Sequence, residues 1–173
     1  YLRVSTELYL KRLIVGGFEK VFEFGRLFRN EGIDKSHNPE FTMLETMEAY
    51  IDYRANMKLV EEMIKQVVRA IKGTTVAEFQ GTAIDFKTPW RRMTMVDAVK
   101  EATGFDYHAM KSFEEAKKAA EKLSVEIKPH ITTIGLILAE IFSEKVEKTL
   151  MQPTIIYDFP YETSPLAKRC AKD

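Results

Sequence analysis

Two hydrophobic patterns alternate along the sequence and predict an α+β fold. Apolar residues recur at every second position in two N-terminal stretches, which is typical of half-buried strands. Helical spacing follows over residues 53–71 and returns after Pro89. The composition agrees, because 45% hydrophobic and 30% charged residues in a chain of 173 are typical of a globular protein that can bury a core.

The first part of the chain predicts one helix followed by a pair of long antiparallel strands. The helix covers residues 5–14, with Ser5 or Thr6 as its cap and two glycines at its end. Strands are expected over residues 21–31 and 41–50, joined by a polar loop. The alternation gives the first strand two faces, one with Phe22, Phe24 and Phe28 and the other with Glu23, Gly25, Arg29 and Glu31.

The remainder predicts a mainly helical segment between parts of a core. Residues 53–71 form a helix, and a small hairpin follows around Gln80 and Gly81. Three more helices begin at the expected caps Thr94, Ser112 and Thr132 or Thr133, the last reaching about Leu150, and a strand returns at residues 153–160. We therefore expect a core segment at residues 1–90, a helical insertion at 91–151, and a return to the core at 152–173.

The charge balance limits the kind of protein that this chain can be. Lys and Arg together number 26, and so do Asp and Glu together, so the formal net charge is zero. The chain therefore lacks the broad basic field of a free-standing nucleic-acid binder. The single Cys170 cannot form an internal disulfide, which favours the cytoplasm. The longest apolar stretch, residues 131–142, is too short to cross a membrane, so we expect no membrane partner. Since the periodic pattern begins directly at Tyr1, we expect a segment of a longer protein.

The strand pair carries the chemistry-bearing residues. Arg29 and Glu31 leave the same face of the first strand, Phe41 and Glu45 share a face of the second, and His37 lies in the loop between them. A guanidinium, carboxylates and an aromatic ring on one surface suit a nucleotide. The pattern alone leaves open a simpler interpretation, in which the charged residues are solvated and Phe41 packs in the core. A second candidate, Trp90 followed by two arginines, is either a small RNA-facing patch or a packed tryptophan at a junction.

Two motifs in this region resemble a known family. Residues 28–32 read Phe-Arg-Asn-Glu-Gly, and residues 37–45 read His-Asn-Pro-Glu-Phe-Thr-Met-Leu-Glu. Together they resemble the second signature motif of the class II aminoacyl-tRNA synthetases, and the particular residues are similar to those of the lysyl-tRNA synthetase family. Further similarity at collinear spacing lies in residues 1–13, 15–21, 152–154 and 164–169. The resemblance covers essentially the whole chain and implies a partial antiparallel-sheet catalytic core with a helical insertion.

The resemblance implies a role for each residue of the motif. Arg29 would bridge the α-phosphate of ATP and the carboxylate of the amino acid, and would be the catalytic residue. Glu31 would accept a hydrogen bond from the adenine amino group, and Phe41 would stack on the base. His37 and Asn38 would contact the phosphates or the adenine side.

The same resemblance implies the substrates and partners. Glu7 and Glu45, with Arg29, would hold lysine, while ATP, tRNA(Lys) and a homodimer partner would belong to the parent enzyme. Magnesium ligands and the third motif would lie beyond Asp173, so the isolated chain is expected to be inactive or very weak. Residue 47 is Met where the family pattern has Tyr. Two alternatives stay open: a lysyl-type ligase that acts on a protein acceptor, and a non-catalytic binding or scaffold fragment.

Overall fold

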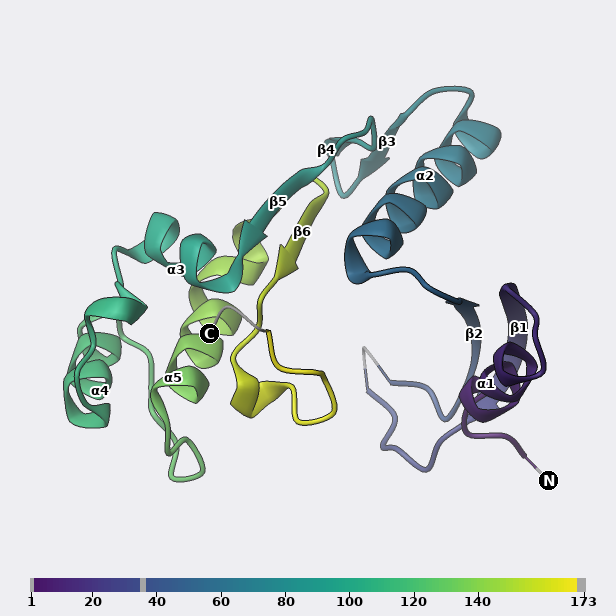
Figure 1. The fold of residues 1–173 in the computed structure, drawn as a ribbon. Helices are drawn as coiled ribbons and strands as arrows, with labels where there is room; N and C mark the ends of the chain where they lie inside the picture. The colour runs from purple at the N-terminus through teal and green to yellow at the C-terminus, as the bar shows by residue number, and fades with distance from the viewer. Residues whose placement is uncertain (1, 35–36, 171–173) are drawn as a thin grey trace. The chain divides into compact units, whose positions relative to one another are not determined.

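The computed structural model describes residues 2–34 and 37–170, which form helices and strands in mixed order (Figure 1). The α+β class predicted from the sequence is confirmed at this level. The chain divides into two compact units, Tyr1–Asn56 and Met57–Asp173.

The first unit is a helix on a β-hairpin. Helix α1 (Glu7–Val15) packs against strands β1 (Lys20–Phe28) and β2 (Glu40–Glu48), which pair antiparallel. Close packing depends on Gly25, because a Cβ there would lie 3.0 Å from the Thr6 Cγ2 atom. Leu10 of the helix and Leu27 of the strand are fully buried in this contact layer. The hairpin therefore presents its Gly25 face to α1.

Both strands are shorter than the alternation predicted, so the expected extension of β1 to Glu31 is wrong. The pairing ends at Phe28 with Glu40. One further bond runs from the Arg29 N–H to the Pro39 carbonyl (2.9 Å), but proline has no N–H to return and the ladder stops. Arg29 and Glu31 consequently lie in the connection rather than on the strand.

The division of β1 into two faces is as predicted. The face with charged residues, however, is the covered one, and the aromatic face is exposed. The face that carries Glu23 and Gly25 lies under α1. Phe22 and Phe24 point away from α1, are 68% and 66% exposed, and contact each other edge to face. The aromatic face of the hairpin is thus the open one.

The second unit begins within α2 (Tyr53–Lys72) and continues through two small sheets. Strands β3 (Val76–Phe79) and β4 (Thr82–Asp85) form the predicted hairpin, with positive φ at both turn residues, Gln80 and Gly81. Strands β5 (Arg91–Thr94) and β6 (Thr154–Tyr157) pair in parallel. Of these two, only β6 was predicted.

The helical part of this unit builds the larger core. Its elements are α3 (Met95–Thr103), η1 (Tyr107–Ala109), α4 (Phe113–Lys122), α5 (Ile134–Ile141), η2 (Phe142–Val146) and η3 (Glu147–Thr149), with η4 (Tyr161–Thr163) after β6. The buried cluster includes Val99, Ile137 and Ile141, each fully inaccessible. The single helix predicted to reach Leu150 is wrong, because α5 changes at Phe142 into a π-helical turn and then a 3-10 turn.

The predicted helix caps of this part are confirmed. The hydroxyls of Thr94, Ser112 and Thr133 accept hydrogen bonds from backbone N–H groups at 3.0–3.2 Å. Gly104 ends α3 in the left-handed conformation, as its position predicted. Within the described ranges, no helix is both long and apolar enough to cross a membrane.

Candidate functional site

All seven residues predicted to bind substrates belong to the first unit, and Arg29 is held at the end of β1. Its Nε donates a hydrogen bond to the Val4 carbonyl (3.3 Å), and the next residue back, Phe28, donates its N–H to the Arg3 carbonyl (2.8 Å). The N-terminal segment therefore runs along the end of β1 and supports the guanidinium.

Arg29 and Phe41 are brought together, as the motif predicted. The guanidinium carbon lies 5.2 Å from the centre of the Phe41 ring, within the range of a cation–π contact. Phe41 is half-buried on β2 opposite Leu27, whereas Arg29 is exposed. The site thus offers a cation with free donors beside a flat apolar ring, a pairing that suits a phosphate next to a planar base.

Glu45 is bound to the start of α1. Its Oε2 accepts from the N–H of Thr6 (3.0 Å) and from the Thr6 hydroxyl, and its Oε1 accepts from the Ser5 hydroxyl (3.4 Å). The Thr6 side chain therefore does not cap α1, contrary to one of the two predicted caps. Ser5 takes part instead, since its hydroxyl accepts the N–H of Glu7 (3.1 Å).

Glu7 is the first residue of α1 and forms an ion pair with Lys11. About half of each side chain is exposed, 52% for Glu7 and 58% for Lys11. An exposed pair at this helical spacing contributes only about 0.3–0.5 kcal/mol. Glu7 is therefore readily released to another cation.

Sequence reasoning missed Arg3 and Glu23. Glu23 stands directly opposite Glu45 in the register, an arrangement of like charges that is unfavourable without partners. Arg3 pairs with Glu23 (Nη1 to Oε1, 2.7 Å), while Glu45 bonds to Thr6. The register of the two strands places Glu23 opposite Glu45, so the need for a partner that relieves this repulsion could have been predicted from the sequence.

The remaining predicted residues lie in the connection between the strands. Asp34 holds His37 in a local turn: its carboxylate accepts the His37 N–H (2.8 Å) and lies 2.8 Å from the ring Nδ1. Among the described residues, the side chain of Asn38 makes one long contact, 3.5 Å, with the N–H of Glu40. Glu31, His37 and Asn38 are all exposed. No contact of theirs with Arg29 or Phe41 is seen in the described part of this connection.

The described residues contain no group of three or more His, Cys, Asp and Glu side chains that could hold a metal ion. The site residues placed above are charged side chains and one aromatic ring. This site can bind phosphate through Arg29, support a base on Phe41, and accept amino groups at Glu45 and Glu7.

Comparison with known proteins identifies the family. The family model for tRNA synthetases class II (D, K and N) matches residues 1–173. The chain is 54% identical over 171 residues to the lysine–tRNA ligase of Clostridium novyi, covering 98% of this chain and 34% of that protein. It is 54% identical over 168 residues to that of Trichormus variabilis (97% and 30%), and 51% identical over 173 residues to that of Staphylococcus aureus (100% and 35%).

The chain thus spans about a third of the length of the curated relatives that it matches. The match to the family model extends over all 173 residues, including both motifs that surround Arg29 and Phe41. This chain belongs to the class II tRNA synthetases of the D, K and N group.

Proposed function

We propose that this chain is the part of a lysine–tRNA ligase catalytic domain that binds ATP and lysine. The observation that carries the proposal is the placement of Arg29 against Phe41 on β2. On the same strand, Glu45 accepts a hydrogen bond from Thr6 at the start of α1. The relatives at 51–54% identity are named lysine–tRNA ligases, which supports lysine as the amino acid.

In the proposed reaction, a carboxylate oxygen of lysine attacks the α-phosphorus of ATP. A bond from this oxygen to phosphorus forms, the bond from phosphorus to the bridging oxygen breaks, and pyrophosphate leaves with the electron pair. Arg29 would hold the carboxylate and the α-phosphate together and stabilise the charge that develops between them. The lysyl-adenylate would then be transferred to tRNA(Lys).

The base and the phosphates would be held by the remaining motif residues. Phe41 offers its ring to adenine, and Glu31 would accept the adenine amino group. His37 and Asn38 lie in the connection, where they would meet the phosphates or the adenine side. Mg²⁺ would neutralise phosphate charge in the complete enzyme, with ligands outside this chain.

Lysine carries two amino groups, and the first unit offers two carboxylates for them. Glu45 keeps free acceptor positions after bonding to Thr6, since a carboxylate has about four lone-pair sites. Glu7 gives up only a weak pair with Lys11. Met47, on the Glu45 face of β2, would border the lysine side chain without donating a hydrogen bond.

The finer architecture is part of the same proposal. Residues 1–90 and 152–173 would belong to the catalytic core, and residues 91–151 would form the insertion. The pairing of β5 with β6 supports a compact insertion, because β5 is its first element and β6 follows directly after its end. We further propose a cytoplasmic homodimer. A ligase for a protein acceptor and a scaffold fragment have no specific observation in their favour.

The test is lysine-dependent exchange between ATP and pyrophosphate, measured on the full-length protein that contains this chain. Arg29→Ala should lower kcat by on the order of a hundredfold to a thousandfold, the usual cost of one placed donor at such a transition state. Arg26→Ala is the matched control, because Arg26 is exposed on the other face of β1 and forms an ion pair with Glu40 (2.7 Å). Exchange that survives Arg29→Ala, or that other amino acids support equally, would contradict the proposal.

A further inference from the structure

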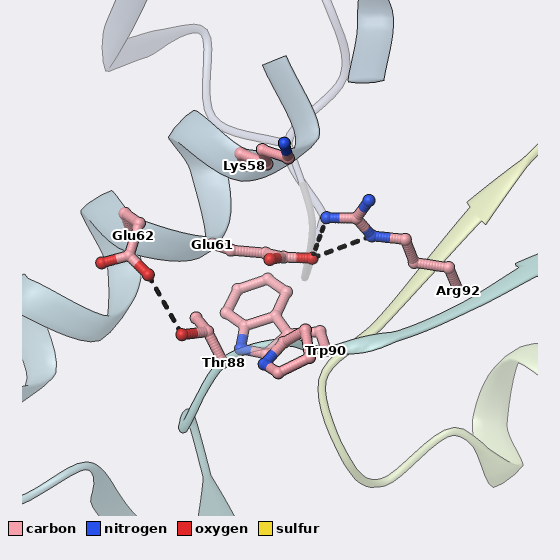
Figure 2. A pocket seen from close by; sticks show the side chains of 7 residues that line it. Lys58, Glu61, Glu62, Thr88, Trp90 and Arg92 are labelled. Atoms are coloured by element: carbon pink, nitrogen blue, oxygen red, sulfur yellow. Dashed lines mark hydrogen bonds and ion pairs between the residues drawn. The ribbon is translucent and has the colours of Figure 1, made fainter. Parts of the chain in front are cut away.

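The second unit contains a cavity that the proposed reaction does not use. We call it the α2–Trp90 cavity; it holds about 530 Å³ between the first turns of α2 and the segment that leads into β5 (Figure 2). Its charged and polar walls are Lys58, Glu61 and Glu62 from α2 and Thr88, Trp90 and Arg92 from the opposite segment. Ligand sites commonly measure about 300–1,000 Å³, so the size suits a small molecule.

Internal contacts already fix most of the polar groups. Arg92 donates from Nε (3.1 Å) and Nη2 (2.8 Å) to the same oxygen of Glu61, Oε1, and Glu61 is only 3% exposed. Glu62 accepts from Lys65 (2.6 Å) and from the Thr88 hydroxyl (3.0 Å). These hydrogen bonds, that of Lys65 first, lower the pKa of Glu62 and keep it ionised. The walls are therefore built before any ligand arrives.

Three groups keep unused bonding capacity. The Nη1 of Arg92 and the Nζ of Lys58 donate no hydrogen bond to any described residue. The Oε2 of Glu61 accepts none either, yet no described side-chain oxygen is both buried and unpaired, so Oε2 keeps some exposed surface, and Glu61 is a lining residue of the cavity. Figure 2 shows this carboxylate between the indole of Trp90 and the amine of Lys58.

The lining of the cavity carries no net charge, because Lys58 and Arg92 balance Glu61 and Glu62. Arg92 is already paired with Glu61, and Glu62 with Lys65, so the ammonium of Lys58 is the charged group of the lining that has no ion-pair partner among the described residues and can receive an anion. Phosphate oxygens are the acceptors that Lys and Arg bind most readily. A simple inorganic anion, however, would leave the aromatic wall and Glu61 Oε2 without a role.

The aromatic wall has a fixed orientation. Trp90 donates its Nε1–H to the Phe86 carbonyl (3.2 Å), and its ring meets that of Phe86 edge to face at 6.2 Å. Indole rings held in this way are surfaces on which nucleic-acid bases stack, with about 1–3 kcal/mol per base. Pro89 adds a second apolar surface beside it.

We propose that the α2–Trp90 cavity binds a nucleotide, either free or as one unit of single-stranded RNA. The phosphate bonds to Lys58 and to Nη1 of Arg92, the base lies against Trp90, and a base amino group or ribose hydroxyl donates to Oε2 of Glu61. The residues of this site belong to the second unit, and none of them is shared with the Arg29 site of the first unit.

The experiment is calorimetric titration of the full-length protein with AMP in a variant that carries Arg29→Ala and Phe41→Ala, which disables the first site. One AMP per chain should still bind. Adding Lys58→Glu should weaken that binding by about tenfold or more. Lys72→Glu is the matched control, because Lys72 lies on the same helix and is exposed away from the cavity. Unchanged Trp90 fluorescence would verify that the variants keep the fold of this unit.

A second arm titrates a short single-stranded oligoadenylate. Lys58-dependent binding of the oligonucleotide identifies an RNA unit as the ligand, and binding of AMP alone identifies a free nucleotide. Absence of both, or binding that Lys58→Glu leaves unchanged, overturns the proposal. Failure of lysine-dependent exchange in the unmodified protein would refute the ligase function without affecting this result, because the titration requires neither lysine nor turnover.

Discussion

The ion pair between Glu61 and Arg92 should respond unequally to removal of its two partners. The Glu61 side chain is 5% exposed and that of Arg92 is 31% exposed, although the same two hydrogen bonds, of 2.8 and 3.1 Å, join them. We consider Arg92→Met and Glu61→Met, which replace each charged side chain by an apolar one of similar length.

The expected cost follows from the charge that each change leaves behind. Arg92→Met strands the carboxylate of Glu61 in a buried position, and uncompensated buried charges cost about 3–5 kcal/mol. Glu61→Met leaves a guanidinium of which nearly a third reaches water, so the loss is closer to that of its hydrogen bonds, about 1.5–3 kcal/mol. Arg92→Met should therefore destabilise the unit more, by about 1–2 kcal/mol.

Urea unfolding followed by tryptophan fluorescence measures this difference. Trp90 is the single tryptophan of the chain and lies beside the pair, so its emission reports unfolding of the Met57–Asp173 unit. The double variant should lose less than the two single variants together, because it leaves no unpaired charge. Equal costs, or a larger cost for Glu61→Met, would refute the argument that burial of the remaining charge decides the energy.

Two further predictions concern packing and titration. Gly25→Ala should lower the free energy of unfolding by about 1–2 kcal/mol, because the added Cβ would lie 3.0 Å from the hydrogen-bonded Thr6 side chain. Gly32→Ala, whose Cβ would meet nothing within 4 Å, is the control in thermal unfolding followed by circular dichroism, and equal losses would disprove the close contact. The hydrogen bond from Lys100 lowers the pKa of Asp106, so its stabilisation is present above the ordinary carboxyl pKa and is lost as pH falls through the lowered value. Lys100→Gln should raise the Asp106 pKa in an NMR titration, and an unchanged pKa would show that Lys100 is not the main cause.

The elements that the sequence predicted well are those defined by neighbouring residues. The caps at Thr94 and Ser112 and the turn at Gln80 and Gly81 each depend on a few adjacent positions. Strand β5 was missed because its partner, β6, lies about 60 residues further along the chain and four residues carry no clear alternation. The break after α5 was missed because hydrophobic spacing does not distinguish an α-helix from a π-helical turn.

The candidate site shows the same limit. The register of the strand pair, which follows from the alternation, is enough to expect Phe41 near Arg29. The hydrogen bond of Thr6 to Glu45 and the ion pair of Arg3 with Glu23 depend on where the N-terminal segment crosses the hairpin. No local pattern encodes that crossing, because it is set by the close approach of α1 over Gly25.

The internal contacts of the first unit suit a site that must exchange partners. The pair of Glu7 with Lys11 and the contact of Arg29 with Phe41 are exposed interactions, each about 0.3–1 kcal/mol. A hydrogen bond that involves a charged ligand contributes about 1.5–3 kcal/mol of binding free energy, so a phosphate or an ammonium group displaces these contacts. Glu45 differs, since its bonds to Thr6 anchor it while leaving acceptor positions open. The weak contacts therefore hold the side chains of Glu7 and Arg29 near their working positions without opposing ligand binding. The stronger hydrogen bonds from Thr6 fix the carboxylate of Glu45 in place.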